Sequence, residues 1–248
     1  MSIKVLITDP ISDKGLEILK KNNIETLYEV NNVIDENKDL LENIDGWIIR
    51  SGTNVTKKHL SKAKKLQIIG RAGVGVDNIN IDAATSNGVV VMNVPDGNTV
   101  SAAEHTLAMI LALSRNIHTG HLTLSDGIWD RHKLTGTELQ GKVLGVVGLG
   151  KIGREVIDRA LSFNIKILGF DPYVNKDLFD SKQVELVTLD DLTKRSDYIS
   201  IHVPKNKSTE NLFDLKRIKM MKKTARIVNV ARGGIINEND LALALNDN

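Results

Sequence analysis

The sequence contains no cysteine, only four prolines and few aromatic residues. Without cysteine, the chain forms no disulfide, offers no thiolate to a metal and has no cysteine nucleophile. No apolar run is long enough to cross a bilayer, and the first residues lack the apolar core of a signal peptide. We therefore expect a cytoplasmic protein with no membrane partner.

Charge of one sign is also missing. The chain has 33 Lys and Arg against 31 Asp and Glu, a net charge of +2 at pH 7, and no concentrated basic tract. Its lysine-rich stretches, at 57–58, 62–65 and 216–223, lie on amphipathic segments and are typical of solvated helix faces. We predict no nucleic-acid partner. A length of 248 residues suits one large or two small globular domains.

The most informative stretch is Gly148-Leu149-Gly150-Lys151-Ile152-Gly153. An apolar, β-branched run at 142–147 precedes it, and residues 154–161 repeat with the period of a helix. A second buried strand is predicted at 165–170, and Asp171 stands at its end. This order of strand, glycine turn, helix, strand and acid is typical of a dinucleotide-binding unit.

Each part of this unit has a physical role. Gly148 permits the tight turn, Gly150 lets backbone N–H groups approach a pyrophosphate, and Gly153 lets the helix pack close to the sheet. The helix N-terminus offers N–H groups and a positive dipole end to the phosphates. Asp171 can accept hydrogen bonds from a ribose diol and would repel a 2′-phosphate, which favours NAD over NADP as cofactor.

Two series of alternating strands and helices are predicted. The first has strands near 3–8, 25–30, 46–50, 66–70 and 89–93, and helices near 12–21, 34–42, 56–63 and 80–87. The second has strands near 142–147, 165–170, 185–187, 198–202 and 226–230, again separated by helices. A polar turn at 95–98 and a connecting helix near 100–115 lie between them. The alternation predicts an α/β fold of parallel sheets with helices on both faces.

Four further stretches, at 70–78, 98–104, 136–142 and 228–234, resemble the D-2-hydroxyacid dehydrogenase family, and most of all its D-3-phosphoglycerate dehydrogenase branch. They read Gly70-Arg71-Ala72-Gly73-Val74-Gly75-Val76-Asp77-Asn78, Asn98-Thr99-Val100-Ser101-Ala102-Ala103-Glu104, Gly136-Thr137-Glu138-Leu139-Gln140-Gly141-Lys142 and Val228-Asn229-Val230-Ala231-Arg232-Gly233-Gly234. The resemblance implies two doubly wound parallel-sheet domains. Residues 1–97 would form the N-terminal part of a flavodoxin-like substrate domain. Residues 98–248 would form a Rossmann NAD-binding domain that lacks its C-terminal end.

The resemblance also implies that Arg232 is catalytic. Arg232 follows the apolar strand at 225–230, so it lies at a strand's carboxyl end, where open α/β sheets bind ligands. A guanidinium can hold a carboxylate with two parallel hydrogen bonds and polarise the neighbouring C2 oxygen. From the residues alone, a surface arginine that caps a turn is an equal alternative.

Other site residues are implied by the same resemblance. The cofactor contacts would be Val74, Gly148, Gly150, Lys151, Ile152, Gly153, Asp171, His202, Val203, Pro204, Val230, Ala231 and Arg232. The substrate contacts would be Arg50, Ser51, Arg71 and Gly73, although ordinary polar loop residues are the alternative for the two arginines. Arg131 would reach the substrate phosphate of a partner subunit.

In this family a histidine, paired with a glutamate, takes the hydroxyl proton, and both lie beyond the arginine motif. The chain stops at Asn248, so we expect a fragment that is inactive alone. None of its histidines matches the position of the base. We expect His59 on a surface helix, His105 packed or capping, and His202 on the adenosine side. His118 and His121 have no third ligand nearby in the sequence, so no metal site is predicted.

The resemblance implies an NAD-dependent enzyme, acting as a homodimer or higher homo-oligomer, that oxidises a small D-2-hydroxy acid. The expected substrate is 3-phosphoglycerate, oxidised to 3-phosphohydroxypyruvate for serine biosynthesis. Alternatives within the class are glyoxylate, hydroxypyruvate, lactate or glycerate. An alternative outside it is a non-catalytic NAD-binding module with a regulatory role.

Overall fold

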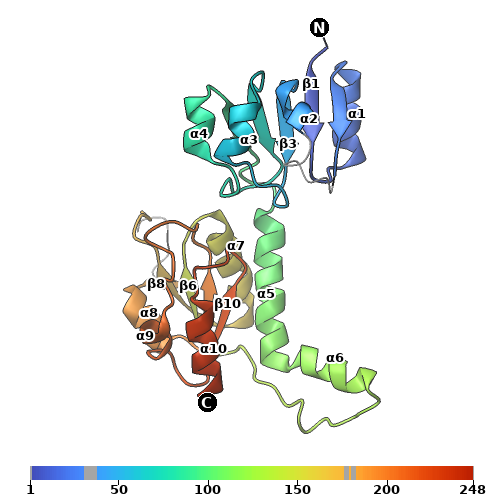
Figure 1. The fold of residues 1–248 in the computed structure, drawn as a ribbon. Helices are drawn as coiled ribbons and strands as arrows, with labels where there is room; N and C mark the ends of the chain where they lie inside the picture. Colours follow the sequence, from blue (N-terminus) through green and yellow to red (C-terminus); the bar gives the residue numbers. More distant parts are fainter. Residues whose placement is uncertain (1, 31–37, 176–178, 180–182, 248) are drawn as a thin grey trace. The chain divides into compact units, whose positions relative to one another are not determined.

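The computed structural model describes residues 2–30, 38–175, 179 and 183–247. The chain forms two compact units, Met1–Asn98 and Thr99–Asn248 (Figure 1). Each unit contains one sheet of five parallel strands with helices packed against it. The predicted fold class, two parallel-sheet α/β domains, is therefore confirmed. No helix in the described part of the chain is long and apolar enough to cross a membrane.

Unit 1 has the strand order β2-β1-β3-β4-β5, which is the order of flavodoxin-like doubly wound folds. All of its strand pairs are parallel. The helix expected at 34–42 lies partly outside the described residues. The elements are β1 (Lys4–Ile7), α1 (Asp13–Lys21), β2 (Glu25–Tyr28), α2 (Lys38–Glu42), β3 (Gly46–Ile49), α3 (Lys57–Lys62), β4 (Ile68–Arg71), α4 (Ile81–Ser86) and β5 (Val90–Asn93).

The core of unit 1 forms on one face of this sheet. Leu6, Trp47 and Ile69, from three neighbouring strands, are fully buried there. Leu60 of α3 and Ala84 of α4 pack against them. Burial of these apolar side chains fixes the strands in register, so that the polar residues that follow each strand meet at one edge.

Unit 2 has the strand order β10-β9-β6-β7-β8, all parallel, which is the order of the Rossmann fold. The order reverses between β6 and β9, and ligands of such sheets bind at that switch point. The elements are α5 (Thr99–Arg115), α6 (Ile117–Ser125), β6 (Val143–Val147), α7 (Lys151–Ala160), the 3-10 helix Leu161–Phe163, β7 (Lys166–Phe170), β8 (Val184–Leu186), α8 (Leu189–Arg195), β9 (Tyr198–Ile201), α9 (Leu215–Ile218), β10 (Arg226–Asn229) and α10 (Glu238–Asn246).

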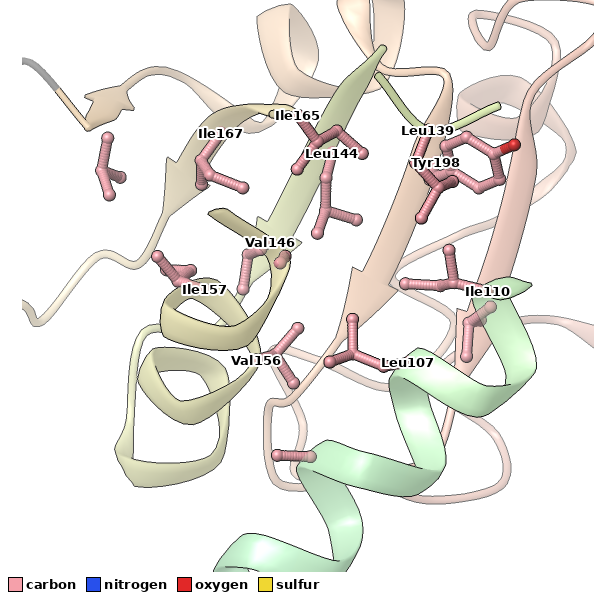
Figure 2. Close-up of a cluster of buried hydrophobic side chains, with 14 of the residues drawn as sticks. Leu107, Ile110, Leu139, Leu144, Val146, Val156, Ile157, Ile165, Ile167 and Tyr198 are labelled. Carbon is pink, nitrogen blue, oxygen red and sulfur yellow. The ribbon is translucent and has the colours of Figure 1, made fainter. Parts of the chain in front are cut away.

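Apolar cores lie on both faces of the unit 2 sheet. On one face, Leu107 and Ile110 of α5 and Val156 of α7 pack on Val146 of β6 (Figure 2). The connecting helix predicted near 100–115 is therefore α5, and it belongs to unit 2. On the other face, Leu192 of α8 lies with residues of β6, β7, β9 and the segments around α9 and α10 in a second cluster: Val147, Leu168, Ile199, Ile201, Phe213, Ile235 and Ile236.

Helix α6 was not predicted as an element of its own. Asn116 adopts a left-handed conformation, φ 53°, and breaks the chain direction between α5 and α6. Figure 1 shows α6 turning away from the end of α5, and none of its residues is buried. The helix therefore leaves apolar side chains in solvent.

Two expectations for histidines are wrong. His59 is buried rather than on a surface: its ring packs edge-on against Trp47, with 6.0 Å between centroids. The backbone N–H of Thr56 also donates to its Nδ1, so His59 completes a capping box at the start of α3. His105 is exposed rather than packed, because it lies on the face of α5 opposite to Leu107 and Ile110.

Candidate functional site

The carboxyl ends of the unit 2 strands bring the predicted cofactor residues of that unit to one edge of the sheet. The glycine turn follows β6, and Asp171 follows β7 on one side of it. His202 follows β9 on the other side, and Arg232 lies beyond it, after β10. A ligand that crosses the switch point between β6 and β9 can therefore contact all four loops.

The three glycines of the turn have different surroundings. Gly148 has φ +95°, and a Cβ on it would lie 2.8 Å from the backbone of His202. A Cβ on Gly153 would overlap the carbonyl oxygen of Gly148, so this residue is small because helix and turn touch. A Cβ on Gly150 would have no neighbour within 4 Å. Gly150 is therefore not required by the fold, and the open space beside it is where a ligand can approach.

These residues fit the pyrophosphate of a dinucleotide. Gly150 is the N-cap residue of α7 and supplies no side-chain cap to the helix start. The N-terminal N–H groups of an uncapped helix and its dipole attract an anion. Because no Cβ stands at position 150, a phosphate can come within hydrogen-bond distance of the backbone there.

Asp171 holds the glycine turn as well as facing the site. Its Oδ2 accepts a hydrogen bond from the backbone N–H of Leu149 at 2.9 Å, and its Oδ1 accepts one from Tyr173 at 2.9 Å. An ionised carboxylate has about four acceptor positions. The half-buried Asp171 can therefore still accept hydrogen bonds from ribose hydroxyls. The link to Leu149 was not anticipated from the sequence.

His202 lies against the turn on its other side. Its backbone N–H donates to Val147 at 2.7 Å, and its Nε2 lies 2.6 Å from the hydroxyl of Ser200. Burial lowers the pKa of His202 to about 4, because the charged ring would lose its hydration. The neutral ring is a poor proton acceptor at pH 7, which argues against His202 as the catalytic base. Val203, next in the chain, also limits the space at the turn, since its Cγ1 would lie 2.9 Å from a Cβ on Gly148.

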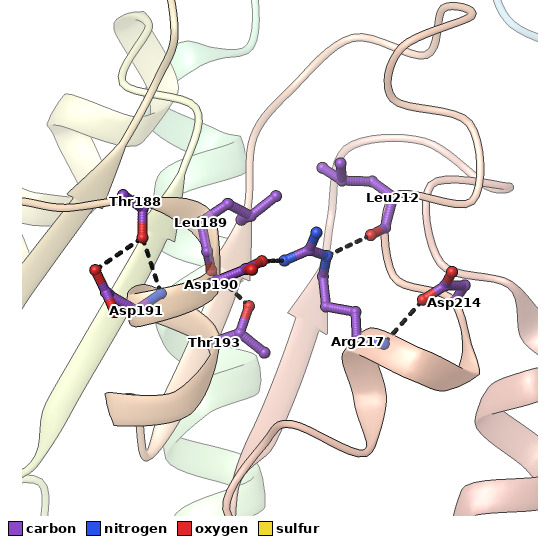
Figure 3. A network of polar contacts seen from close by, with 8 residues as sticks. All are labelled: Thr188, Leu189, Asp190, Asp191, Thr193, Leu212, Asp214 and Arg217. Carbon is purple, nitrogen blue, oxygen red and sulfur yellow. Dashed lines mark hydrogen bonds and ion pairs between the residues drawn. The ribbon is translucent and has the colours of Figure 1, made fainter.

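The loop that begins at Pro204 is held by its own side chains. The hydroxyl of Thr209 donates to the carbonyl of Pro204 at 2.6 Å, and Asn206 Oδ1 accepts the N–H of Ser208 at 2.8 Å. Arg217 of α9 then joins this loop to α8 (Figure 3). Its Nε donates to the carbonyl of Leu212 at 2.9 Å, and its Nη1 donates to Asp190 at 2.6 Å.

Arg232 lies on a loop whose backbone is hydrogen-bonded to the segment between Pro204 and α9. The N–H of Asn211 donates to Gly234 at 2.9 Å, and the N–H of Phe213 donates to Ile235 at 3.1 Å. Val230 and Ala231 run from the end of β10 to Arg232, and all three are half-buried. The Arg232 Nη1 donates to the carbonyl of Ala231 at 2.8 Å. Cofactor contacts at these residues, and at Lys151, Ile152 and Pro204, stay predictions.

Unit 1 brings the four predicted substrate residues together. Arg50 and Ser51 follow β3, Arg71 ends β4 and Gly73 follows it, and all four line one pocket of about 400 Å³. Arg71 folds across Gly73, where a Cβ would overlap its guanidinium. The Arg71 Nε is buried and has no hydrogen-bond partner among the described residues. A buried donor of this kind is costly unless a ligand accepts from it.

Val74 was predicted to contact the nicotinamide. It lies just after β4, and its carbonyl accepts a hydrogen bond from Asn93 Nδ2 at 2.6 Å. This contact ties the loop after β4 to the end of β5. Its cofactor role stays a prediction.

Two side chains that the sequence did not point to hold the Arg50 loop. Asp9 Oδ2 accepts the N–H groups of Arg50 at 2.7 Å and Thr53 at 3.2 Å. Asn78 Nδ2 donates to the carbonyls of the same two residues, at 2.7 and 2.5 Å. One side chain thus satisfies the N–H groups and the other the carbonyls. The only sequence signals were that Asp9 directly follows a predicted strand and that Asn78 closes the stretch beginning at Gly70.

Asp9→Ala is expected to lower the free energy of unfolding by about 1–3 kcal/mol, because it leaves the buried N–H of Thr53 unpaired, and the partly buried N–H of Arg50 also loses its partner. Asp9 is 7% exposed, so water cannot easily replace it. Asp9→Asn is the matched control: both bonds go to one oxygen, which an amide retains, so the loss should be smaller. Urea unfolding measures both. Equal stabilities of wild type and Asp9→Ala would show that Asp9 does not hold the Arg50 loop.

The chain is similar in sequence to D-3-phosphoglycerate dehydrogenases. D-3-phosphoglycerate dehydrogenase of Methanocaldococcus jannaschii is 45% identical over 250 aligned residues, which cover 99% of this chain and 47% of that protein. The Homo sapiens D-3-phosphoglycerate dehydrogenase is 42% identical, over 98% of this chain and 45% of that protein. The chain thus spans about half the length of the curated relatives it matches.

Solved structures agree in fold. A Staphylococcus aureus NAD-dependent formate dehydrogenase, in complex with NAD, superposes with a TM-score of 0.87 at 32% identity, covering 100% of this chain and 78% of that one. The TT0316 protein from Thermus thermophilus gives a TM-score of 0.89 at 29% identity, covering 98% and 78%. Residues 107–248 match the model of the family described as "D-isomer specific 2-hydroxyacid dehydrogenase, NAD binding domain". The chain therefore belongs to the D-isomer specific 2-hydroxyacid dehydrogenase family, and NAD is its cofactor.

Proposed function

We propose that the whole protein oxidises 3-phosphoglycerate to 3-phosphohydroxypyruvate with NAD, the reaction that opens serine biosynthesis. The similarity to D-3-phosphoglycerate dehydrogenases supports this substrate. In this proposal residues 1–97 supply substrate contacts, and residues 98–248 bind NAD. NAD, when bound, accepts the hydride that leaves C2 of the substrate.

The chain's own residues then bind and polarise the substrate. Arg232 holds the carboxylate with two parallel hydrogen bonds and stabilises charge at the C2 oxygen. The hydroxyl proton goes to a general base. His202 is unsuited to that role because its pKa is lowered to about 4. We therefore predict, as from the sequence, that residues 1–248 alone do not turn over the substrate.

The observation that favours a phosphorylated substrate is that Arg50 and Arg71 line the same pocket. A phosphate group carries nearly two negative charges at pH 7 and offers acceptors in several directions. Arg71 contributes a buried donor with no protein partner among the described residues. Lactate and glyoxylate carry only the carboxylate that Arg232 would hold, so they would leave Arg50 and Arg71 without an anionic partner, and a site built this way discriminates against them.

A panel of substrates tests the proposal. We expect kcat/KM of the whole protein with NAD to be at least about 100-fold higher for 3-phosphoglycerate than for D-glycerate, which differs only by the phosphate. Arg71→Ala should raise KM for 3-phosphoglycerate and leave that for D-glycerate little changed. Equal rates with both acids, or a higher rate with lactate or glyoxylate, would assign another substrate. NADH binding with no turnover of any acid would favour the regulatory module.

Asp171 should make NAD(H) bind at least tenfold more tightly than NADP(H), which is about 1.4 kcal/mol. The physical reason is repulsion between its carboxylate and a 2′-phosphate. Asp171→Ala should narrow the gap, but it also removes the acceptor of the Leu149 N–H. Asp171→Asn keeps an acceptor for Leu149 without the charge, so it should narrow the gap with a smaller loss of NADH affinity. Calorimetric titration with both cofactors measures this, and equal affinities in the wild type would remove the argument.

We also propose that the protein is a homodimer or higher homo-oligomer. Its subunits would be joined by residues 117–129, which comprise α6 and the turn after it and are called the α6 segment below. Five apolar side chains on this segment are 52–69% exposed: Ile117, Leu122, Leu124, Ile128 and Trp129. A concentration of exposed apolar residues on a helix with none buried is typical of a protein interface. Arg131, which is exposed just after them, keeps its predicted role toward a partner's substrate.

Combining Leu122→Glu with Trp129→Glu is expected to weaken self-association at least tenfold, because each carboxylate would be buried without a partner. Tyr173→Glu changes an exposed aromatic residue of unit 2 outside the α6 segment and is the control. Sedimentation equilibrium of the three proteins measures the constants. An unchanged mass for the double variant would place the interface elsewhere.

A further inference from the structure

Asn229 is the last residue of β10, and its side chain reaches forward over the turn that follows. Its Nδ2 donates to the carbonyl of Arg232 at 2.8 Å, and its Oδ1 accepts the N–H of Ala231 at 3.1 Å. One amide thus closes the turn at a carbonyl and at an N–H of two successive residues. No other residue type of this size supplies a donor and an acceptor side by side.

The two bonds hold the backbone on both sides of the peptide that joins Ala231 to Arg232. Asn229 orients the peptide after Arg232 through the Arg232 carbonyl, and the peptide between Val230 and Ala231 through the N–H of Ala231. The Arg232 Nη1 donates at 2.8 Å to the carbonyl of Ala231, so the guanidinium itself rests on this turn. The direction of the guanidinium therefore depends on the shape that Asn229 imposes.

The rest of the loop is held independently of Asn229. Beyond Gly233, the backbone of Gly234 and Ile235 accepts hydrogen bonds from Asn211 and Phe213. Ile235 and Ile236 are buried. Loss of the Asn229 side chain would therefore free residues 230–233 without detaching the loop from unit 2.

We propose that Asn229 is a positioning residue that sets the direction of the Arg232 guanidinium and thereby the transition-state binding of the substrate. The proposal rests on the catalytic role proposed for Arg232. Asn229 acts through Arg232 and touches neither substrate nor cofactor in this role. Small displacements of a positioned group can cost about 100-fold in rate, so the effect belongs in kcat rather than in folding.

The first experiment compares Asn229→Ala with Asn237→Ala in the whole protein. Asn237 caps α10, where its side chain accepts the N–H of Asp240 at 3.1 Å, so its loss also removes a side-chain-to-backbone bond from unit 2. Asn229→Ala should lower kcat about 10- to 100-fold, with the Kd of NADH and the Tm close to those of Asn237→Ala. Asn237→Ala should keep wild-type kcat. A kcat of Asn229→Ala equal to that of Asn237→Ala would overturn the proposal.

A double-mutant cycle shows whether the effect passes through Arg232. Once Arg232→Lys has removed the guanidinium, adding Asn229→Ala should lower kcat/KM less than about twofold further. An equal further loss in that background would assign Asn229 to general structure and overturn the proposal. If Arg232→Lys alone keeps wild-type activity, the proposed role of Arg232 fails instead, and the two failures are distinct.

Asn229→Asp separates the two hydrogen bonds. Its carboxylate keeps an acceptor for the Ala231 N–H but lacks the donor to the Arg232 carbonyl, and it can pair with the guanidinium in place of the substrate. We expect kcat/KM of Asn229→Asp to be at or below that of Asn229→Ala, although the shape of the side chain is conserved. Wild-type kcat/KM in Asn229→Asp would contradict a role for the donated bond.

Discussion

Arg232→Lys should lower kcat/KM of the whole protein about 1000-fold while NADH binds as before. Hydrogen bonds to charged groups contribute about 1.5–3 kcal/mol each, and a planar guanidinium makes two parallel ones to a carboxylate. An ammonium keeps the charge but not this two-point contact. The loss should appear in both kcat and KM, because the same group binds the carboxylate and stabilises charge at the C2 oxygen.

Arg226→Lys is the matched control for this substitution. Arg226 lies at the opposite end of the same strand, β10, where its Nη1 donates to the Tyr198 hydroxyl at 3.0 Å and to Thr137 at 3.3 Å. The same chemical change at that end should cost some stability and leave kcat/KM within about twofold. Steady-state kinetics with 3-phosphoglycerate and fluorescence titration with NADH measure the pair. A kcat/KM for Arg232→Lys within about fivefold of wild type would mean that another residue holds the carboxylate.

The two sheets were predictable because their strands are short apolar runs separated by helical periods. The ten strands were placed within two residues of their observed ends, as for Val143–Val147 and Val184–Leu186. A strand that is buried on one face has an apolar residue at every second position, and a strand that is buried on both faces is a continuous apolar run, so both can be recognised in the sequence. The turn at Gly148 was equally visible, because its glycines, helix and acid have fixed spacing.

What the sequence did not show are contacts between a side chain and a distant backbone. Asp9 meets Arg50 and Thr53, and Asp171 meets Leu149, because parallel strands bring their carboxyl ends to one edge. Such contacts have no period, since each depends on the order of strands in the sheet. His59 was misplaced for a related reason: its partner Trp47 belongs to a strand, and local periodicity describes only the helix that carries His59.

The connecting helix was predicted to end near residue 115, where α5 ends, but the helix α6 that follows it was not predicted. Asn116 adopts a left-handed conformation between the two helices, and no proline or glycine marks the change of direction there. None of the residues of α6 is buried. Only the structure shows that, among the described helices and strands, α6 packs closely only on α5.

Gly150 and Gly153 of the turn should respond differently to substitution by alanine. Gly153→Ala is expected to lower the free energy of unfolding by at least about 2 kcal/mol, because its Cβ would overlap the backbone carbonyl of Gly148. Backbone cannot move aside as a flexible side chain can, so the helix α7 must shift from the sheet. Gly150→Ala has open space around its Cβ and φ −68°, which alanine adopts readily, so its stability should be close to wild type.

Cofactor binding should separate the two variants further. The Cβ of Gly150→Ala would stand in the space through which a pyrophosphate reaches the start of α7, so the Kd of NADH should rise at least about 100-fold, or about 2.7 kcal/mol. This loss would occur in a fully folded protein, whereas any loss in Gly153→Ala would accompany its lower stability. Thermal unfolding of each variant gives its stability, and calorimetric titration with NADH gives its Kd. Tight NADH binding by a stable Gly150→Ala protein would mean that the cofactor does not lie against this turn, since nothing in the fold itself requires a glycine at position 150.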